Sequence, residues 1–542
     1  MQEYVVTLKS YDDLESFYED METDGGSITI PDRRVDCACR RDISRNTHYM
    51  LTEEEAELVR NDDRVLAVEL LPSLRDIKPS FFWEQFDDFE KSSTIETNDK
   101  NWGLYRVVNG HVPSWGTDSL FSQLTGEVFT TSSGKHVDVV VVDAHINPNH
   151  PEFAVNPDGT GGSRVNLYDW FQHSATLGIS TTGSYDYSDI SSNHGTHVAG
   201  TVAGNTQGWA RDANIYNMEF NYAGSFPFSD WDLYLFDYIR EWHKTKPINP
   251  VTRRRNPTVT NHSWGYSYGN ISLSSINSVY FRGVTLAVAG LIDPAKKVAL
   301  EERGVPVPAN TYLFRTPARV AALDADIQDA IADGVIVISS AGNSYWNIAT
   351  PSSQDYGNYI IVGSTQLFHQ RGASPGAADN VICVGSVGTT NAEYKSNFSN
   401  YGERVDIWGP GSNIASAVYD NTAATEFGIT LANDPRDSNY KLGSISGTSM
   451  SGPQVAGILA CYAEQNQNIS QAEALEYLID NSTPDLGDTG GNYGDYTSLG
   501  DSTNNRYLKY KFERPLTGMT FNTGTHKKRP STGTVFPRRR YR

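Results

Sequence analysis

Apolar runs alternate with amphipathic stretches through most of the chain. Runs rich in β-branched residues have the composition of parallel strands buried on both faces, and they occupy residues 137–142, 213–218, 258–263, 335–340 and 381–386. Helical spacing occurs between several of these runs, at residues 197–203, 230–244, 319–332 and 452–465. Strands that alternate with helices predict βαβ units. The expected fold class is therefore α/β, with a doubly wound and mainly parallel sheet.

A different pattern precedes this region. Strands are expected at residues 4–8, 27–31 and 65–71, and helical spacing occurs at residues 11–18. Thr52 and Glu55 form a capping box in front of a second helix. The order strand, helix, strand, helix, strand is typical of a ferredoxin-like unit. We therefore expect a small α+β domain at residues 1–75.

Three further segments depart from both patterns. Residues 76–100 are aromatic and acidic and then polar, which indicates a connector that packs on the protein. Residues 283–317 look like an insertion within the α/β domain of residues 101–510. Residues 511–542 are basic and hold a Pro-x-Thr-Gly-x-x-Phe repeat. A solvated tail is the simpler interpretation of this end, and docking to a partner or an anionic surface is the sharper one.

Composition narrows the classes of function. The 542 residues carry a net charge of −21, which argues against nucleic-acid binding by the body and leaves the basic tail open. No apolar run is long enough to span a bilayer, so no membrane partner is expected. The first residues lack a secretory signal, which favours a cytoplasmic location. Cys383 and Cys461 lie in apolar runs and are expected to be buried, and the cysteine usage suits a reducing compartment.

Polar side chains follow the expected strands at the edge where parallel sheets collect functional groups. Asp143, Ser263 and Asn343 each stand at such a strand end. A buried carboxylate at Asp143 needs a partner, although an Asp at this place can also cap a turn. Asn343 in a Gly-Asn pair is an ordinary turn residue, but beside a nucleophile its side-chain amide suits an oxyanion.

Two histidines open a helix of small residues, His194 and His197. Their spacing of three permits metal ligation, but no zinc pattern surrounds them. His197 is best interpreted as a core histidine with satisfied hydrogen bonds. At the helix start, a role as a base competes well for His194.

A further small-residue turn, Gly447-Thr448-Ser449-Met450, precedes an apolar helix. Thr448 or Ser449 could simply cap that helix, which is the commonest task of Ser and Thr before an apolar run. A serine at a helix N-terminus also lies in a field that stabilises negative charge beside it. The stretch alone leaves a cap and a nucleophile about equally supported.

Four blocks in order decide between these interpretations. Val142-Asp143, His194-Gly195-Thr196-His197, Ala341-Gly342-Asn343 and Gly447-Thr448-Ser449-Met450 resemble the signature blocks of the subtilisin-like serine proteases. The order Asp, His, Asn, Ser is that of this family and differs from the order in chymotrypsin or the α/β-hydrolases. The resemblance covers about residues 101–480.

The resemblance implies a serine endopeptidase that cleaves polypeptides through an acyl-enzyme. Ser449 would be the nucleophile, His194 its base, Asp143 the partner of the base, and Asn343 an oxyanion donor. Segments expected to flank the substrate as extended strands contain Ser263, Trp264, Gly265, Ala341 and Gly342. Trp264 would either narrow the first specificity pocket or pack beneath the site.

The resemblance also gives the N-terminal domain a role. It implies a propeptide that assists folding and acts as an intramolecular inhibitor, with a mature chain that begins near Asn101. The chemistry needs no cofactor. Calcium commonly stabilises the family, but no ligand loop here can be matched residue by residue, so the metal ligands are unknown. The tail repeat resembles the termini of virion proteins from large tailed phages, which adds virion association and a phage origin to the expectations.

Two alternatives stay open at this stage. One is an inactive or latent protein that keeps a protease fold for a structural or assembly role. The filled set of four polar positions argues against it, since a scaffold has no need of that set. The other is peptide ligation through the same acyl-enzyme.

Overall fold

The structure is a computed structural model that describes residues 1–81, 102–110 and 130–511. Short gaps within these ranges are residues 28, 32, 42, 189, 191, 221, 223–225, 308–312, 390–391, 491–495 and 501–502. Most of the expected connector and almost all of the expected tail lie outside the described residues. The proposed domain boundaries stay predictions.

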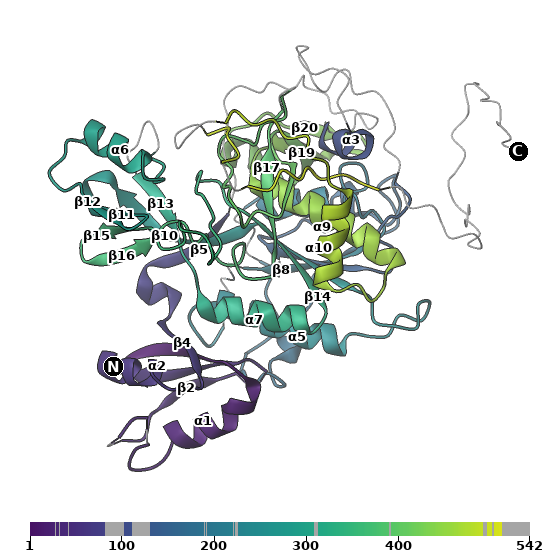
Figure 1. The fold of residues 1–542 in the computed structure, drawn as a ribbon. Coiled ribbons are helices and arrows are strands. Elements are labelled where there is room, and N and C mark those ends of the chain that lie inside the picture. The colour runs from purple at the N-terminus through teal and green to yellow at the C-terminus, as the bar shows by residue number, and fades with distance from the viewer. Residues whose placement is uncertain are drawn as a thin grey trace, which may run out of the picture.

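The N-terminal unit is a sandwich of two helices on one antiparallel sheet (Figure 1). Its strands run in the order β2-β3-β1-β4, and its elements follow the sequence β1 (Gln2–Leu8), α1 (Leu14–Met21), β2 (Cys37–Arg40), β3 (Asn46–Leu51), α2 (Glu53–Arg60), β4 (Val65–Leu70). This is the ferredoxin-like arrangement that the sequence predicts. The capping box of Thr52 and Glu55 is present at the start of α2.

The prediction of a strand at residues 27–31 is wrong. Those residues that are described form a turn with an isolated bridge from Gly26 to Pro31, and β2 lies further along the chain. Ile30 is buried nonetheless. The apolar spacing therefore came from a loop that folds onto the core, and Pro31 lacks the N–H that a strand ladder uses.

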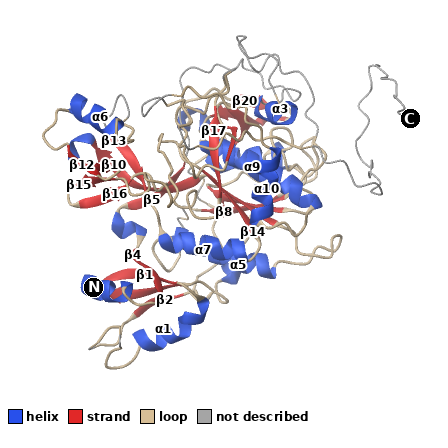
Figure 2. Ribbon diagram, viewed as in Figure 1, coloured by secondary structure: helices blue, strands red, loops and turns tan. Residues whose placement is uncertain are grey.

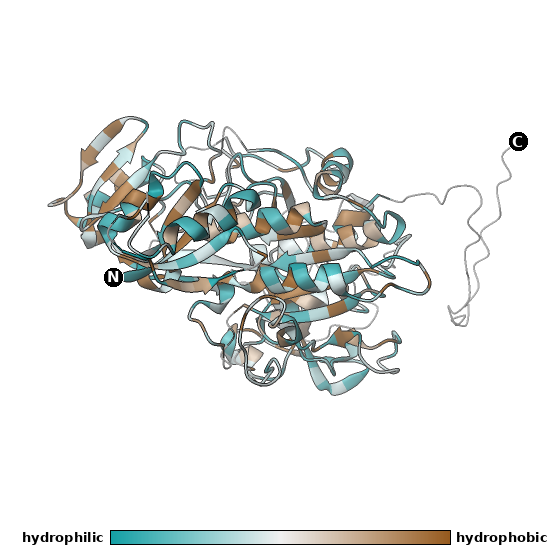
Figure 3. Cartoon of the chain, turned by 90° about the horizontal axis from the view of Figure 1, so that it is seen from below, coloured by the Kyte–Doolittle hydropathy of each residue, from teal (hydrophilic) through white to brown (hydrophobic). Residues whose placement is uncertain are grey.

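The expected α/β domain is built around one central parallel sheet. Its described strands run in the order β18-β17-β14-β9-β6-β8-β7, and every pair in it is parallel. The strands are β6 (Asp138–Asp143), β7 (Val165–Asn166), β8 (Asn214–Glu219), β9 (Thr258–His262), β14 (Val335–Ser340), β17 (Ile382–Val387) and β18 (Ile407–Pro410). The predicted doubly wound sheet is confirmed, and its strands are largely buried, whereas the helices seen in Figure 3 carry both hydrophilic and hydrophobic residues.

Helices cover the sheet, as Figure 2 shows. They include α4 (His194–Ala203), α5 (Leu235–Thr245), α7 (Ala321–Ala332), α9 (Thr448–Gln465) and α10 (Gln471–Asn481). Helices α5 and α7 lie side by side between the sheet and the N-terminal domain, and α7 contacts β1, β3 and β4 (Figure 1). The N-terminal sheet therefore packs on two helices of the body.

Strand β5 leaves the N-terminal domain and joins the body. It spans Ile77–Phe81 and is the outer strand of a sheet of order β13-β10-β5, with β10 (Trp264–Ser272) in the middle and β13 (Leu313–Pro317) beyond it. The pairing of β5 with β10 is antiparallel. The first residues of the expected connector are thus an ordered strand.

The region of the expected insertion belongs to a small unit with its own core. Its sheet has the order β12-β11-β15-β16, formed by β11 (Ile276–Phe281), β12 (Val284–Ala287), β15 (Tyr359–Val362) and β16 (Thr365–Phe368), with α6 (Asp293–Glu301) beside it. Leu273, Val279, Leu300 and Ile360 contribute to that core. The unit projects from the body (Figure 1).

The remaining described elements complete the body. They are α3 (Trp102–Asn109), α8 (Ala423–Glu426) and the sheet β19-β21-β20, which comprises β19 (Ile414–Val418), β20 (Ala432–Asp434) and β21 (Asp437–Ile445). Cys383 and Cys461 are buried and free, as predicted. Among the residues that can be described, no helix has both the length and the apolar character that crossing a bilayer requires.

Candidate functional site

An aspartate and a histidine form a fully buried pair at the edge of the central sheet. Asp143 is the last residue of β6, and His194 is the first residue of α4. The Nδ1 atom of His194 lies 2.7 Å from Oδ1 of Asp143, and neither side chain is exposed. Oδ1 also accepts a hydrogen bond of 2.8 Å from the backbone N–H of Ala144. Burial raises the pKa of the Asp143 carboxyl, and His194 opposes that rise.

Close packing of α4 on the loop after β6 brings this pair together. A Cβ atom at Gly195 would lie 2.1 Å from the carbonyl oxygen of Ala144, so only glycine fits between helix and loop. The Thr196 hydroxyl donates to the carbonyl of His145 and accepts from the N–H of Asn147. Three successive residues of the motif His-Gly-Thr-His therefore have separate tasks. His194 supplies the imidazole, Gly195 allows the helix and the loop to approach closely, and Thr196 hydrogen-bonds the loop to the helix.

Two further carboxylates bind residues next to the pair in sequence, and the sequence motifs did not identify them. Glu426 of α8 accepts hydrogen bonds from the Asn193 backbone N–H and side chain, both at 2.8 Å, just before His194. Glu219 of β8 lies 2.9 Å from Nδ1 of His145, and both side chains are buried. These contacts join segments far apart in sequence, so no local pattern could have revealed them.

Ser449 lies inside the first turn of α9, which begins four residues earlier than the sequence pattern indicated. The cap residue is Gly447, which makes no side-chain capping bond, so the interpretation of Thr448 or Ser449 as a simple helix cap is wrong. The Ser449 hydroxyl donates to the carbonyl of Ser263 at 3.0 Å. Helices α4 and α9 pack against each other. The helix N-terminus places partial positive charge beside this hydroxyl.

Asn343 is tied to the same turn. Its side-chain oxygen accepts from the backbone N–H of Thr448 at 2.9 Å and from the Thr448 hydroxyl at 2.8 Å. The Gly342 N–H donates to that hydroxyl, and Gly342 has a φ of 103° that favours glycine. The Asn343 side-chain nitrogen is buried and has no partner within the described parts of the chain. This amide is oriented by its oxygen and keeps its N–H groups available.

The expected substrate-flanking residues separate into two groups. Trp264 and Gly265 begin β10, whose outer edge is taken by β5. Ala341 and Gly342 instead have their carbonyl oxygens engaged by Asn400, at 2.7 and 2.8 Å. Their backbone fixes the position of Asn343, and their contact with substrate stays a prediction.

Trp264 is fully buried. Its ring stacks on Phe220, with 5.1 Å between centroids and an angle of 9° between planes. Edge contacts to His262 and Tyr266 complete its surroundings. The ring is part of the hydrophobic core beneath the site, which favours the packing role over a wall of the first specificity pocket.

His197 does not contribute to this site. Its Nε2 lies 2.9 Å from the carbonyl of Ile414 and 3.2 Å from that of Gly443, so this nitrogen carries the proton. Burial lowers its pKa to about 3. His197 is thus a neutral core histidine, as the sequence suggested, but only Nε2 is hydrogen-bonded, since its buried Nδ1 has no partner among the described residues.

A metal centre has no support in the described part of the chain. No group of three or more His, Cys, Asp or Glu side chains there could hold an ion. The expectation of structural calcium stays a prediction. The arrangement of Asp143, His194, Asn343 and Ser449 provides a buried base with its carboxylate, a hydroxyl at a helix N-terminus and an oriented amide. Together these groups suit nucleophilic acyl transfer.

Known proteins resemble this chain in sequence. The model of the subtilase family matches residues 134–506. Alkaline serine exoprotease A of Vibrio alginolyticus is 26% identical over 398 residues, which is 72% of this chain and 48% of that protein. Subtilisin-like serine protease pepC of Aspergillus niger is 27% identical over 405 residues, 72% of this chain and 53% of that protein. The matches thus span about half the length of these curated relatives.

Solved structures are also similar. A cold-adapted subtilisin-like serine proteinase has 22% identity and a TM-score of 0.43, with 77% of this chain and 100% of that chain covered. Fervidolysin from Fervidobacterium pennivorans, a keratinolytic enzyme related to subtilisin, has 14% identity and a TM-score of 0.44, with 94% of this chain and 60% of that chain covered.

Proposed function

The chain belongs to the subtilase family, and we propose that it is a serine endopeptidase that is held latent by its own N-terminal domain. The family match covers the segment that contains all four candidate catalytic residues. The buried Asp143–His194 pair and the position of Ser449 in the first turn of α9 support the proposal.

In the proposed reaction, the Ser449 hydroxyl attacks the carbonyl carbon of a peptide bond. His194 takes the hydroxyl proton and then gives it to the leaving amine. Asp143 holds the imidazole through Nδ1 and stabilises the imidazolium that forms. Water then hydrolyses the acyl-enzyme by the same steps with His194 again as the base.

One observation carries the assignment more than any other. The Asn343 amide is anchored through its oxygen to Thr448, the residue before Ser449, while its nitrogen is buried without a partner in the described residues. A buried donor left unpaired costs free energy, and an amide that binds a transient anion must keep its N–H groups available until that anion forms. An oxyanion that forms beside Ser449 provides the acceptor during the reaction.

Latency is supported by the position of β5. It pairs antiparallel with β10 so that Phe81 lies opposite Trp264, Ser80 opposite Gly265 and Pro79 opposite Tyr266. The backbone carbonyl of Ser263, directly before β10, accepts a hydrogen bond from the Ser449 hydroxyl. A polypeptide substrate would bind by adding a strand to this same edge. The N-terminal domain thus delivers a strand that competes with substrate.

A serine-directed fluorophosphonate tests the nucleophile. The full chain is treated as it is, and again after its connector has been cut by limited proteolysis and the N-terminal domain has been removed, and mass spectrometry locates the label. We expect labelling of Ser449 after the N-terminal domain has been displaced, and no labelling of a Ser449→Ala chain. Equal labelling of both chains, or none of the displaced wild-type chain, would favour the structural alternative.

Peptide products test the reaction. We expect hydrolysis of a denatured protein substrate at internal bonds, with new N-termini and no joined peptides. For self-cleavage we expect a new N-terminus between residues 82 and 101, the segment that links β5 to α3. Accumulation of joined peptides would indicate ligation instead.

A further inference from the structure

The N-terminal domain contacts the body through a second attachment, far in sequence from β5. Arg41, which follows β2, inserts between helices α5 and α7 and is 1% exposed. Its guanidinium meets Asp237 of α5 and Asp326 of α7, with Nη2 2.7 Å from a carboxylate oxygen of each. Nη2 also donates to the carbonyl of Leu233 at 2.8 Å. We name Asp237, Asp326 and the Leu233 carbonyl the Arg41 site.

Two more polar side chains of the N-terminal domain bind next to Arg41 on the body. Ser44 donates its hydroxyl to Asp326, and the side-chain amide of Asn46 donates to Asp326 and to the carbonyl of Ala322, each at 2.9 Å. The ring of Tyr234 lies below the guanidinium at 4.8 Å. Asp237 and Asp326 are 2% and 0% exposed.

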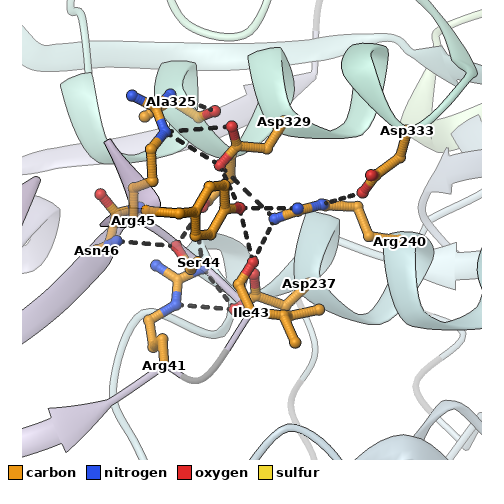
Figure 4. A network of polar contacts seen from close by, with 12 residues as sticks. Arg41, Ile43, Ser44, Arg45, Asn46, Asp237, Arg240, Ala325, Asp329 and Asp333 are labelled. Atoms are coloured by element: carbon orange, nitrogen blue, oxygen red, sulfur yellow. Dashed lines mark hydrogen bonds and ion pairs between the residues drawn. The ribbon is translucent and has the colours of Figure 1, made fainter. Parts of the chain in front are cut away.

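A second set of contacts surrounds the first, as Figure 4 shows. The Tyr11 hydroxyl donates to Asp329 at 2.7 Å, and Arg45 donates to the same carboxylate at 3.2 Å. The body also donates to the N-terminal domain. Arg240 of α5 donates to the carbonyl of Ile43 at 2.6 Å and to the Tyr11 hydroxyl at 2.8 Å. Asp333 holds the Arg240 guanidinium in place at 2.7 Å.

We propose that the Arg41 site is a docking site for one buried arginine, which keeps the N-terminal domain bound to the body after the connector has been cut. This inference rests on the proposed latency. Under this proposal, latency ends only when Arg41 leaves its site between α5 and α7. Cleavage of the chain alone leaves β5 on β10 and the active site covered.

The number and the sign of the charges at the Arg41 site support this role. Two carboxylates on different helices of the body converge on one guanidinium, and both lose their water when the domain docks. Desolvated carboxylates are unfavourable without a cation. An arginine is always charged, and its planar guanidinium donates to Asp237 through Nε at 2.8 Å in addition to the contacts of Nη2, a fork of donors that a lysine lacks. The site therefore selects an arginine-bearing partner and resists its removal.

The attachment is independent of β5. Arg41 lies in the loop between β2 and β3, whereas β5 follows β4 at the end of the domain. The two contacts reach different parts of the body, α5 with α7 in one case and β10 in the other. Binding through two linked contacts is stronger than through either alone, because the second forms at a high effective concentration.

The test measures binding without catalysis. A recognition site for a specific protease is placed within residues 84–99 of a Ser449→Ala chain, the chain is cut, and the apparent Kd of the two fragments is measured. We expect the wild-type interface to keep the fragments together through gel filtration. Arg41→Met should raise the apparent Kd about 30-fold or more, because it leaves two buried carboxylates unpaired.

Arg40→Met is the matched control. Arg40 is adjacent in sequence, but it pairs with Glu22 and lies over the Tyr18 ring within its own domain. This variant should bind within about threefold of wild type, since exposed pairs contribute little. An Arg41→Met interface as tight as that of Arg40→Met would overturn the proposal.

A change on the body guards against misfolding of the N-terminal domain. Asp326→Asn leaves that domain unaltered and should also weaken binding. The double variant with Arg41→Met should weaken it less than the product of the two single effects, because both act on one contact. If Arg41→Met fails to fold, full retention of binding by Asp326→Asn would overturn the proposal. Failure of the endopeptidase assignment would not affect these binding measurements.

Discussion

Two buried charged centres in this protein have opposite tasks. At the proposed active site, one carboxylate, Asp143, faces one imidazole, His194. At the domain interface, two carboxylates, Asp237 and Asp326, face one guanidinium. Both centres are closed to solvent. An imidazole can gain and lose a proton near neutral pH, whereas a guanidinium cannot. The first centre therefore suits proton transfer, and the second suits a lasting contact between domains.

The difference shows that burial alone does not identify a catalytic group. Helix α4, which carries His194 of the proposed active-site pair, packs on α9, whose first turn holds the Ser449 hydroxyl and binds the Asn343 amide, a group whose nitrogen is unpaired among the described residues. At the Arg41 site, Ser44 and Asn46 donate hydrogen bonds to Asp326, and no hydroxyl of the described residues there stands in the first turn of a long helix. The groups around a buried pair therefore decide whether it takes part in chemistry.

The largest effect should come from the reactive centre. Asp143→Asn should lower kcat about 10⁴-fold, because the amide no longer holds the imidazole in the required tautomer. Binding of the N-terminal domain should stay unchanged. Rates on a peptide substrate and the fragment Kd would be measured on the same preparation. A fall in binding that matched the fall in rate would mean that the two centres are not separate.

Asn343→Ala should have the next largest effect. Removal of one oxyanion donor costs about 10²–10³-fold in kcat, as measured for subtilisin itself. The value of KM should change little, because the donor acts in the transition state. Asn400→Ala is a useful comparison, since Asn400 contacts the same segment through backbone carbonyls and not the reacting groups. A loss confined to KM would remove Asn343 from the proposed role.

The smallest effect is a pH dependence of domain retention. Burial next to Asp237 raises the pKa of Asp326 to about 7, while Arg41 opposes the rise. The docked state therefore binds a proton more strongly than the separated body, where the carboxyl returns toward its ordinary range. This contribution to docking is complete below the ordinary pKa and is lost as pH rises through the docked pKa.

Asp326→Asn isolates that contribution. The ratio of wild-type to Asp326→Asn affinity should fall as pH rises from 6 to 8. His48 lies over Tyr234 at the interface, and burial lowers its pKa, so its contribution has the opposite sign. It is common to both chains and cancels in the ratio. Fragment Kd values at several pH values provide the measurement, and a flat ratio would contradict the assignment.

Local signals were sufficient for much of the fold. The apolar runs located the interior strands to within one or two residues, since β-branched composition reflects burial on both faces. The capping box at Thr52 fixed the start of α2. The run at residues 27–31 misled because Ile30 enters the core from a loop. Apolar spacing records burial, and burial does not require a strand.

The sequence by itself determined the catalytic candidates, because their residue types are demanded by the chemistry and occur in short motifs in a fixed order. The tertiary structure alone decided that β5 lies on β10 and that Arg41 reaches α5 and α7. Arg41 is 196 residues from Asp237 along the chain, and no local pattern couples positions at that separation. Short motifs carry the reacting groups, whereas the contacts that cover the site come from surfaces that meet only after folding.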